Sequence, residues 1–226
     1  MTSSAALEAR DLYRFYRAGD EETLALRGVS LTVEAGEFVA VTGPSGSGKS
    51  TLLACLSGLD EPDGGAVFLS GQRLSHRSER ERTKARGRGV GVLLQSNNLV
   101  PHLTITDNIR LAQRFGGGPG SLPPAQLLAS VGLSGRSHAR PAQLSGGEGV
   151  RAGLAVAVAN APRVLVADEP TGELDAGTEA LVLELVREQA TSGCAVVVVS
   201  HSPAVAAVAD RVVRLADGTI VHEQAR

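Results

Sequence analysis

One segment of the sequence combines glycines, a lysine and hydroxyl side chains at a spacing that suits phosphate. Residues 43–51 match the pattern GxxxxGK(S/T), with an apolar run before them and a helical stretch after them. Glycines let successive backbone N–H groups point at phosphate oxygens, and the helix N-terminus adds positive charge. Lys49 is expected to reach the outer phosphates, and Ser50 to ligate Mg²⁺. The motif predicts a nucleotide site made of Gly43, Pro44, Ser45, Gly46, Ser47, Gly48, Lys49, Ser50 and Thr51.

Two adjacent acids form a second candidate element. The apolar run 164–167 ends in Asp168 and Glu169. An acid at the carboxyl end of a strand beside a phosphate loop suits Mg²⁺ held through water. The second acid suits a base or polariser for an attacking water molecule. Acids at strand ends are common on protein surfaces, so the pair becomes informative only together with the phosphate loop.

The elements that must position these residues follow from apolar patterning. Runs at 38–42, 164–167 and 195–199 are typical of strands buried on both faces of a parallel sheet. A helical stretch at 49–57 and an amphipathic pattern at 178–190 lie between these runs. Strands that alternate with helices predict a parallel sheet with right-handed crossovers.

Three other segments have patterns of a different kind. Residues 24–33 indicate one or two half-buried strands, and residues 211–221 indicate a hairpin over an Asp-Gly turn. Residues from about 96 to 150 hold five prolines and a run of three glycines, which favours a mostly helical insertion in the α/β core. Residues 76–88 hold six basic and two acidic side chains without aromatics, which favours a solvated surface helix over a nucleic-acid or lipid-headgroup patch.

The composition argues against several other classes. A chain of 226 residues fits one large domain or a domain with a subdomain. Its net charge of −2 and its 3% of aromatic residues give no indication of a nucleic-acid partner. Cys55 and Cys194 lie in apolar runs, so we expect two buried thiols rather than a disulfide framework or a zinc site. No apolar run approaches the roughly 18 residues of a membrane span, and no signal peptide is apparent, so we expect a cytoplasmic protein.

A further segment indicates the class. Residues 144–148 read Leu-Ser-Gly-Gly-Glu, and Ser145 lies 23 residues before Asp168. This segment resembles the signature of the ABC ATPases, and the resemblance covers essentially the whole chain. A phosphate-loop kinase or GTPase lacks such a signature. The other family elements occur in the expected order: Tyr16 resembles the adenine-stacking aromatic, Gln95 the Q-loop, 168–171 the Walker B segment, 172–175 the D-loop, and His201 the switch histidine. Tyr13 and Phe15 stay open as alternatives to Tyr16.

The resemblance implies a fold with three parts. The expected core is a P-loop NTPase (RecA-like) α/β core with a mainly parallel sheet, joined by an N-terminal antiparallel β subdomain and an inserted α-helical subdomain. Residues 1–94 and 151–226 would form the core with the β subdomain, and residues 95–150 the helical subdomain that carries the signature.

The resemblance also implies a mechanism. Two subunits would enclose two ATP molecules head to tail, with Ser145, Gly146 and Gly147 of one subunit completing the site of the other. Within one site, Glu169 would orient the attacking water, His201 would contact the γ-phosphate, and Gln95 would sense the Mg²⁺ held by Ser50 and Asp168. Asp175 would tie the two subunits together.

Within the family, the chain most resembles the ATPases of lipoprotein-releasing and macrolide-exporting systems. This resemblance rests on the segments 16–20, 58–60 and 98–104. It implies a separate membrane permease, a homodimer at the inner face of the membrane, and export or mechanical transmission that acts on a lipid, lipoprotein, peptide or drug-like substrate. Two alternatives stay open: a non-transport ABC ATPase, for example of the iron–sulfur assembly type, and a degenerate cassette that only binds nucleotide.

The chain departs from the family pattern at a few positions. Gly149 and Val150 stand where glutamines are usual, and Val156 stands where an arginine is expected. Ser202 replaces the acid that commonly follows the switch histidine. Gly149 and Gly153 would each cost about 1 kcal/mol relative to alanine in a helix interior. None of these positions is expected to contact phosphate, so we expect catalysis to be retained.

Overall fold

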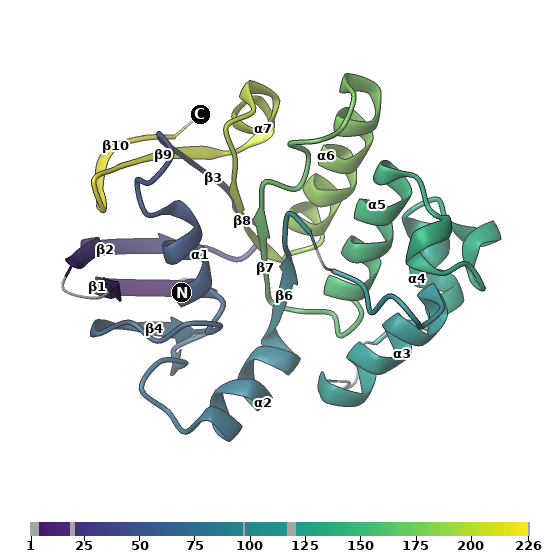
Figure 1. Cartoon of the computed structure of the whole chain (residues 1–226), viewed down its shortest axis with the longest axis horizontal. Helices are drawn as coiled ribbons and strands as arrows, with labels where there is room; N and C mark the ends of the chain where they lie inside the picture. The colour runs from purple at the N-terminus through teal and green to yellow at the C-terminus, as the bar shows by residue number, and fades with distance from the viewer. Residues whose placement is uncertain (1–4, 19–20, 97, 117–120, 226) are drawn as a thin grey trace.

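The computed structural model describes residues 5–18, 21–96, 98–116 and 121–225. Gly19 and Asp20, which belong to the segment 16–20, and Gly117, Gly118 and Pro119 of the insertion lie outside the described residues. Within the described part, a six-stranded sheet forms the centre, with a four-stranded sheet on one side and most of the helices on the other (Figure 1).

The central sheet has the strand order β10-β9-β3-β8-β7-β6. Neighbouring strands from β9 to β6 are parallel, and only β10 pairs antiparallel, with β9. The three predicted buried runs all form strands of this sheet. Its members are β3 (Phe38–Thr42), β6 (Val90–Leu93), β7 (Val164–Asp168), β8 (Ala195–Val199), β9 (Arg211–Ala216) and β10 (Thr219–Ala225).

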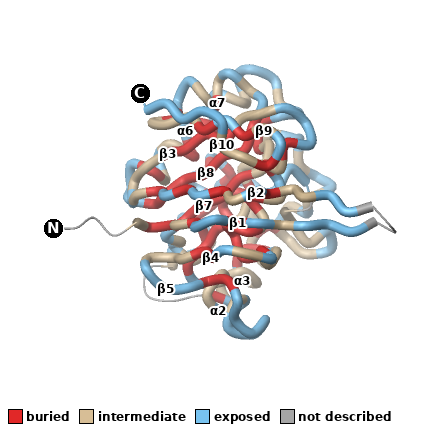
Figure 2. The backbone as a smooth tube through the Cα atoms, turned by 90° about the vertical axis from the view of Figure 1, so that its left-hand side faces the viewer, coloured by how far each residue is buried: buried red, intermediate tan, exposed pale blue. Residues whose placement is uncertain are grey.

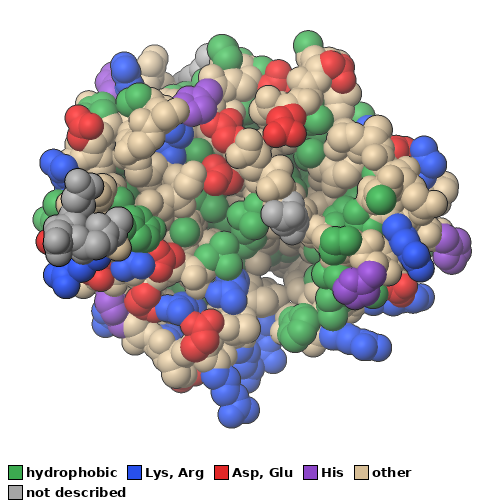
Figure 3. Space-filling view, viewed as in Figure 1, with side chains coloured by type: hydrophobic (Ala, Val, Ile, Leu, Met, Phe, Trp, Pro, Cys, Tyr) green, Lys and Arg blue, Asp and Glu red, His purple; other side chains and the backbone are tan. Residues whose placement is uncertain are grey.

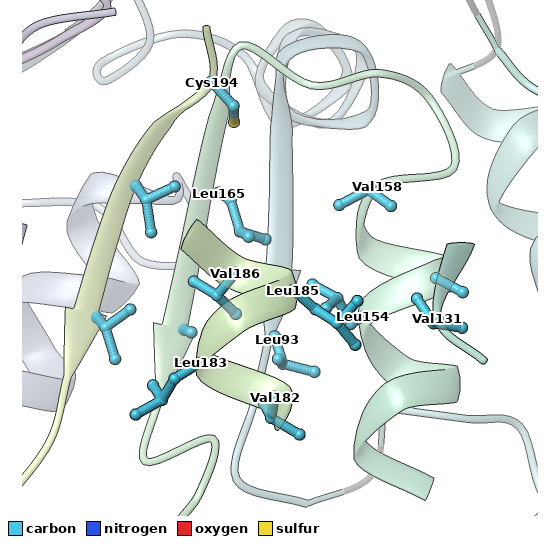
Figure 4. Packing of buried hydrophobic residues seen from close by; sticks show 14 of the residues in the cluster. Leu93, Val131, Leu154, Val158, Leu165, Val182, Leu183, Leu185, Val186 and Cys194 are labelled. Carbon is cyan, nitrogen blue, oxygen red and sulfur yellow. The ribbon is translucent and has the colours of Figure 1, made fainter. Parts of the chain in front are cut away.

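Continuous apolar strands are required because both faces of this sheet are covered. Along β8, Val196 and Val198 face one hydrophobic cluster, whereas Val197 and Val199 face the other. The first cluster includes residues of α3 to α6, and the second includes residues of α1 and the smaller sheet. Figure 2 shows the central strands as a buried band through the molecule. Figure 4 shows side chains of α6, among them Val186, packed over Leu165 of β7.

The smaller sheet is antiparallel, with the order β2-β1-β4-β5. Its strands are β1 (Leu7–Ala18), β2 (Glu21–Val33), β4 (Gly64–Leu69) and β5 (Gln72–Arg73). Only part of β2 was expected from the sequence. Strand β1 was not expected because its register is irregular: Asp11 has a positive φ of 48°, and the pairing of β1 with both β2 and β4 contains register shifts. Such bulges break the alternation on which strand prediction depends.

Most of the helices lie where the sequence predicts them. The stretch at 49–57 forms α1, which ends at Leu56, and the pattern at 178–190 forms α6. In the described part of residues 96–150 the structure has helices and short 3₁₀ turns but no strand, and the proposed boundary at 150 falls within α5. The helices are α1 (Lys49–Leu56), α2 (Glu79–Gly89), α3 (Ile105–Gly116), α4 (Pro124–Ser130), α5 (Gly146–Ala157), α6 (Ala176–Thr191) and α7 (Pro203–Val208). The expected fold class is confirmed.

The basic segment and the two cysteines lie in the surroundings that the sequence predicts for them. The basic segment forms the mostly exposed helix α2, at the lower edge of the view where Figure 3 shows Lys and Arg side chains projecting. Cys55 and Cys194 are buried free thiols, and burial raises the pKa of both to about 12. In the part of the chain that the structure describes, no helix is both long and apolar enough to cross a membrane.

Candidate active site

The phosphate loop joins the end of β3 to the start of α1. Two of its glycines are required by neighbouring backbone. A Cβ at Gly43 would lie 2.1 Å from the carbonyl oxygen of Leu215, and a Cβ at Gly48 would lie 2.4 Å from that of Ala25. Both glycines also have positive φ values, 148° and 100°, which other residues rarely adopt. The loop can therefore pass closely between β2 and β9 only with glycine at these positions.

The hairpin β9–β10 supports the loop from outside. Asp217 and Gly218 both have positive φ values, as a two-residue Asp-Gly turn requires, so the predicted hairpin is confirmed. The Gly218 N–H donates to the carbonyl oxygen of Ser47 at 3.0 Å, and the Gly218 carbonyl accepts from the Arg27 N–H at 2.8 Å. The turn thus connects the phosphate loop to β2.

The polar side chains of the loop are held at its centre. Lys49 Nζ donates to the carbonyl oxygens of Gly43 and Pro44, both at 2.9 Å, and the side chain is largely buried. Ser47 Oγ is buried and has no hydrogen-bond partner among the described residues. A buried hydroxyl without a partner leaves hydrogen-bonding capacity that an anion in the loop can use.

A hollow of 400 Å³ opens beside the loop. It is lined by Gly46, Gly48, Lys49, Ser50 and Thr51 together with residues of β1, β2 and the hairpin turn. Tyr16 is one of the lining residues. Its hydroxyl donates to Asp60 Oδ2 at 3.0 Å, and the Arg14 guanidinium lies 4.8 Å from its ring centroid.

The two alternative aromatics lie elsewhere. Tyr13 packs beside Gly28 and Gly64, and Phe15 lines a different hollow. Of the three candidates, Tyr16 alone lines the hollow beside the phosphate loop. An exposed aromatic ring at the mouth of such a hollow provides a stacking surface for a base.

Asp168 connects the phosphate loop to the second group of candidate residues. It ends β7, and its carboxylate hydrogen-bonds with the side chain of Ser50. Burial raises the pKa of Asp168, while the hydrogen bond with Ser50 and the charge of Lys49 act in the opposite direction. A hydroxyl and a carboxylate in contact offer two hard oxygen ligands at the end of the loop.

Glu169 follows in a strained backbone conformation, with φ at 44°. Its Oε2 accepts a hydrogen bond from Ser200 Oγ at 3.0 Å and another from the His201 N–H at 3.3 Å. Its Oε1 lies 3.4 Å from His201 Nε2 and is buried, with no hydrogen bond to any residue that the structure describes. The carboxylate is therefore oriented through one oxygen and retains accepting capacity on the other.

A second hollow, of 590 Å³, brings three predicted residues together. Gln95 lies just beyond β6, Glu169 beyond β7 and His201 beyond β8, and all three line this hollow. The carboxyl ends of neighbouring parallel strands meet at one edge of the sheet, which explains the convergence.

Two residues that no sequence motif predicts, Glu179 and Ser200, hold the side chains and loops of this hollow in place. Glu179, in the first turn of α6, accepts hydrogen bonds from Thr171 and Ser202. An acid in a first helical turn is ordinarily interpreted as a favourable charge near the helix N-terminus, so no sequence signal identifies it. The sequence places Ser200 directly before His201 but does not predict its hydrogen bond to Glu169.

The signature segment lines neither of these hollows, but Gly146 lines a neighbouring hollow of 350 Å³ together with Gln95 and Glu169. Ser145 caps α5: its Oγ accepts from the Glu148 N–H at 3.3 Å, and Glu148 Oε2 accepts from the Ser145 N–H at 2.9 Å. This hydrogen bond, together with Arg136, lowers the pKa of Glu148. Ser145 and Gly146 are exposed, and neither they nor Gly147 line the two hollows.

Asp175 also caps a helix and lines neither hollow. Its Oδ1 accepts from the N–H groups of Gly177 and Thr178, and its Oδ2 accepts from the Thr178 hydroxyl at 2.7 Å. The hydrogen bonds from Thr178 lower the pKa of Asp175. Its carboxylate is thus engaged at the start of α6.

A parallel sheet with a phosphate loop after β3 and an acid pair at the end of β7, with β8 between these two strands, defines a nucleoside triphosphatase of the phosphate-loop class. Residues 26–172 match the ABC transporter family model. The lipoprotein-releasing ATP-binding protein LolD of Paramagnetospirillum magneticum is 41% identical over 96% of this chain and 97% of its own length. The macrolide export ATP-binding/permease protein MacB of Hyphomonas neptunium is 40% identical over 96% of this chain, which corresponds to 34% of its own length.

Solved structures agree with these sequence matches. The ATP-binding cassette MJ0796, in a dimeric post-hydrolysis state bound to ADP and Pi, superposes with a TM-score of 0.89 at 34% identity. The superposition covers 97% of this chain and 98% of the cassette. The chain belongs to the ABC transporter family and is an ATP-binding and ATP-hydrolysing cassette. The resemblance inferred from the sequence is confirmed.

Proposed function

We propose that this ATPase drives a separate membrane permease from the cytoplasmic face of the membrane. The support comes from relatives that match nearly all of this chain and are named for lipoprotein release or macrolide export. By this likeness, the energy of ATP would serve export or mechanical transmission that acts on a lipid, lipoprotein, peptide or drug-like substrate. The single observation that carries the catalytic assignment is the convergence of Gln95, Glu169 and His201 in one hollow next to Asp168.

The phosphate loop and Tyr16 would hold the nucleotide. Lys49, now bound to two loop carbonyls, would turn to the outer phosphates, and Ser47 Oγ would gain the partner that it lacks. Tyr16 would supply the stacking face for adenine. Backbone N–H groups of the glycine-rich loop and the N-terminus of α1 provide the remaining positive field.

The residues present also fit Mg²⁺. The Ser50 hydroxyl and the Asp168 carboxylate are in contact, and both are oxygen ligands of the kind that Mg²⁺ prefers. Gln95 would add a side-chain oxygen from the second hollow. When bound, Mg²⁺ neutralises part of the charge on the phosphates.

Glu169 would orient the attacking water. Its Oε1 is buried and accepts no hydrogen bond within the described part of the chain, while Ser200 and the His201 N–H hold Oε2. A carboxylate fixed through one oxygen can accept a water proton at the other without rotating away. His201, whose side chain is 53% exposed in the same hollow, would contact the terminal phosphate.

A second copy of the chain would complete the site. Ser145, Gly146 and Gly147 begin a 12-residue helix, so their N–H groups can receive an anion held by the phosphate loop of the other copy. The dimeric structure of the similar cassette MJ0796 supports this arrangement. Asp175 would add a contact between the two copies near the start of α6.

The substitution Glu169→Gln tests the catalytic assignment. It keeps the size of the side chain but removes its basicity, so we expect ATP binding at the parental affinity and a turnover reduced at least about 100-fold. Binding is measured with a fluorescent ATP analogue, and turnover by phosphate release. The control is Glu184→Gln, an exposed glutamate on α6. Turnover in Glu169→Gln equal to that of the parent would overturn the assignment.

Co-purification tests the transport assignment. The tagged chain is isolated from detergent-solubilised membranes of its own host, and the accompanying proteins are identified. We expect a polytopic membrane protein in stoichiometric amount. Recovery with soluble assembly proteins alone would move the function to the non-transport class.

A further inference from the structure

One carboxylate oxygen outside the predicted site connects two loops of the second hollow. Glu179 Oε1 accepts from Thr171 Oγ1 at 2.9 Å and from Ser202 Oγ at 2.6 Å. Thr171 belongs to the segment after Glu169, whereas Ser202 follows His201. Both donors therefore belong to loops that carry a candidate catalytic residue.

The contact at Ser202 continues toward Glu169. The Ser202 N–H donates to Ser200 Oγ at 3.0 Å, and Ser200 Oγ donates to Glu169 Oε2 at 3.0 Å. A hydrogen-bonded chain thus runs from Glu179 through the two serines that flank His201 to the carboxylate of Glu169. Displacement of Ser202 would change the position of both His201 and Ser200.

The Thr171 contact fixes the other loop. Thr171 is buried, with 3% of its surface exposed, so its hydroxyl needs a partner within the protein. The N–H of Gly172 and the N–H of Leu174 donate to the carbonyl oxygens of Glu169 and Thr171, respectively, which makes this segment a compact turn. Removal of the Glu179 carboxylate would leave a buried hydroxyl unpaired at the centre of that turn.

Ser202 has a second hydrogen bond that restricts what can replace it. Its Oγ accepts from the Ala204 N–H at 3.2 Å and so caps α7, while its proton goes to Glu179. Aspartate also caps helices well, and an acid is the residue that the family resemblance leads one to expect here. In this chain, however, an aspartate would face the carboxylate of Glu179 at hydrogen-bonding distance, and the two like charges would repel.

We infer that Glu179 is a positioning residue of the ATPase site. Its carboxylate, supplied from α6, holds the loop after Glu169 and the loop around His201 in a fixed relation, and its presence requires a hydroxyl rather than an acid at position 202. The inference rests on the proposed roles of Glu169 and His201. It assigns Glu179 no contact with ATP, so its loss affects turnover rather than binding.

Four variants of the full chain test the inference. Glu179→Ala removes the acceptor, and we expect kcat to fall about tenfold with little change in the KM for ATP. Glu179→Gln keeps a carbonyl oxygen for both donors, so we expect it to retain most of the activity. Ser202→Asp introduces the repulsion and is expected to lower kcat about tenfold as well. The double variant Ser202→Asp/Glu179→Gln replaces the repulsion with an amide-to-carboxylate hydrogen bond, and we expect kcat to recover to within about threefold of the parent.

The matched control is Glu184→Ala, which removes an exposed glutamate from the same helix. Urea unfolding is followed in parallel for each variant. If Glu179→Ala fails to fold, the comparison of Ser202→Asp with the double variant Ser202→Asp/Glu179→Gln tests the inference instead. Recovery by a second substitution requires direct coupling between the two positions.

Three results would overturn the inference. The first is parental kcat in Glu179→Ala, the second is a loss in Ser202→Asp that Glu179→Gln does not relieve, and the third is a loss of equal size in the Glu184→Ala control. The proposed catalytic roles fail on a separate observation, which is turnover in Glu169→Gln at the parental rate.

Discussion

The phosphate loop and the hollow around Glu169 are constructed in different ways. Residues 43–51 are consecutive, and backbone groups of β2, β9 and the hairpin turn determine their shape. The hollow takes Gln95, Glu169 and His201 from three loops that are far apart in the sequence, and side-chain hydrogen bonds hold two of these loops together. The shape of the phosphate loop thus follows from one contiguous motif, whereas the hollow around Glu169 depends on how three separate loops pack against each other and against their neighbours.

We expect the largest effect from Lys49→Ala, which should impair ATP binding by the phosphate loop, whereas variants in the hollow around Glu169 should impair turnover. Lys49→Ala removes the charge that the phosphate loop directs at its ligand, so we expect ATP affinity to fall at least about 100-fold. Glu169→Gln, in the assembled hollow, is expected to leave that affinity unchanged. Affinity is measured by calorimetry or with a fluorescent ATP analogue.

The other lysine of the chain provides the control. Lys84 lies on the exposed helix α2, and Lys84→Ala should bind ATP as the parent does. Parental affinity in Lys49→Ala would show that the loop does not hold the phosphates through this side chain.

Two glycines of α5 allow a test of how packing supports the assembled hollow. Among the residues that the structure describes, a Cβ at Gly149 would meet nothing within 4 Å. A Cβ at Gly153 would lie 2.9 Å from Asn98 Cβ and 3.0 Å from Leu93 Cδ1. Asn98 binds both backbone groups of Leu94 and so closes the loop that contains Gln95. The sequence expectation of an equal cost at both glycines is therefore wrong at Gly153, where the absence of a side chain permits close packing.

We expect opposite effects from alanine at these two positions. Gly149→Ala should raise the free energy of unfolding by about 0.5–1 kcal/mol, because alanine reduces the conformational entropy of the unfolded chain and its methyl group fits the open surface of the helix. Gly153→Ala should lower it by about 1–3 kcal/mol through overpacking, and should also reduce kcat by displacing the loop of Gln95. Urea unfolding and phosphate release measure the two quantities.

The phosphate loop serves as the internal reference for this pair. ATP affinity should stay within about twofold of the parent in both variants, because neither glycine touches residues 43–51. A stabilising Gly153→Ala would show that the loop around Gln95 adapts freely to α5.

The contrast between the two regions also explains what the sequence reveals. Strands β3, β7 and β8 were predictable because burial on both faces demands unbroken apolar runs, and the Asp-Gly turn of β9–β10 has a local signature. Strand β1 was not predictable, because its bulge at Asp11 breaks the alternation. Strand β5 has only two residues, which is too short for any pattern.

The candidate site shows the same difference between local motifs and contacts that form only on folding. The residues of the phosphate loop follow from one motif, whereas Gln95 and His201 could be proposed only through the family resemblance. Glu179 could not be identified at all, because its role depends on Thr171 and Ser202, which lie 8 and 23 residues away and meet it only in the folded chain.

The smallest expected effect concerns Asp168, where the two regions meet. Its pKa is raised by burial above the ordinary 3.8, so the ionised form is less favourable in the folded chain than in the unfolded chain. This cost is fully present above the raised pKa and disappears as the pH falls toward 3.8. Asp168→Asn should therefore raise the free energy of unfolding slightly at neutral pH, and the difference from the parent should shrink in acid.

Asp175 provides a control of opposite sign. Hydrogen bonds from Thr178 lower its pKa, so its ionised form stabilises the folded chain above 3.8, and this contribution is lost as the pH falls through the lowered value. Asp175→Ala should therefore destabilise the chain at neutral pH, and the loss should fade in strong acid. Urea unfolding of both variants and the parent across the acidic range separates the two cases. A stabilising effect of Asp168→Asn that grows in acid would contradict burial as the cause, because protonation of the parent must remove the charge that the variant lacks.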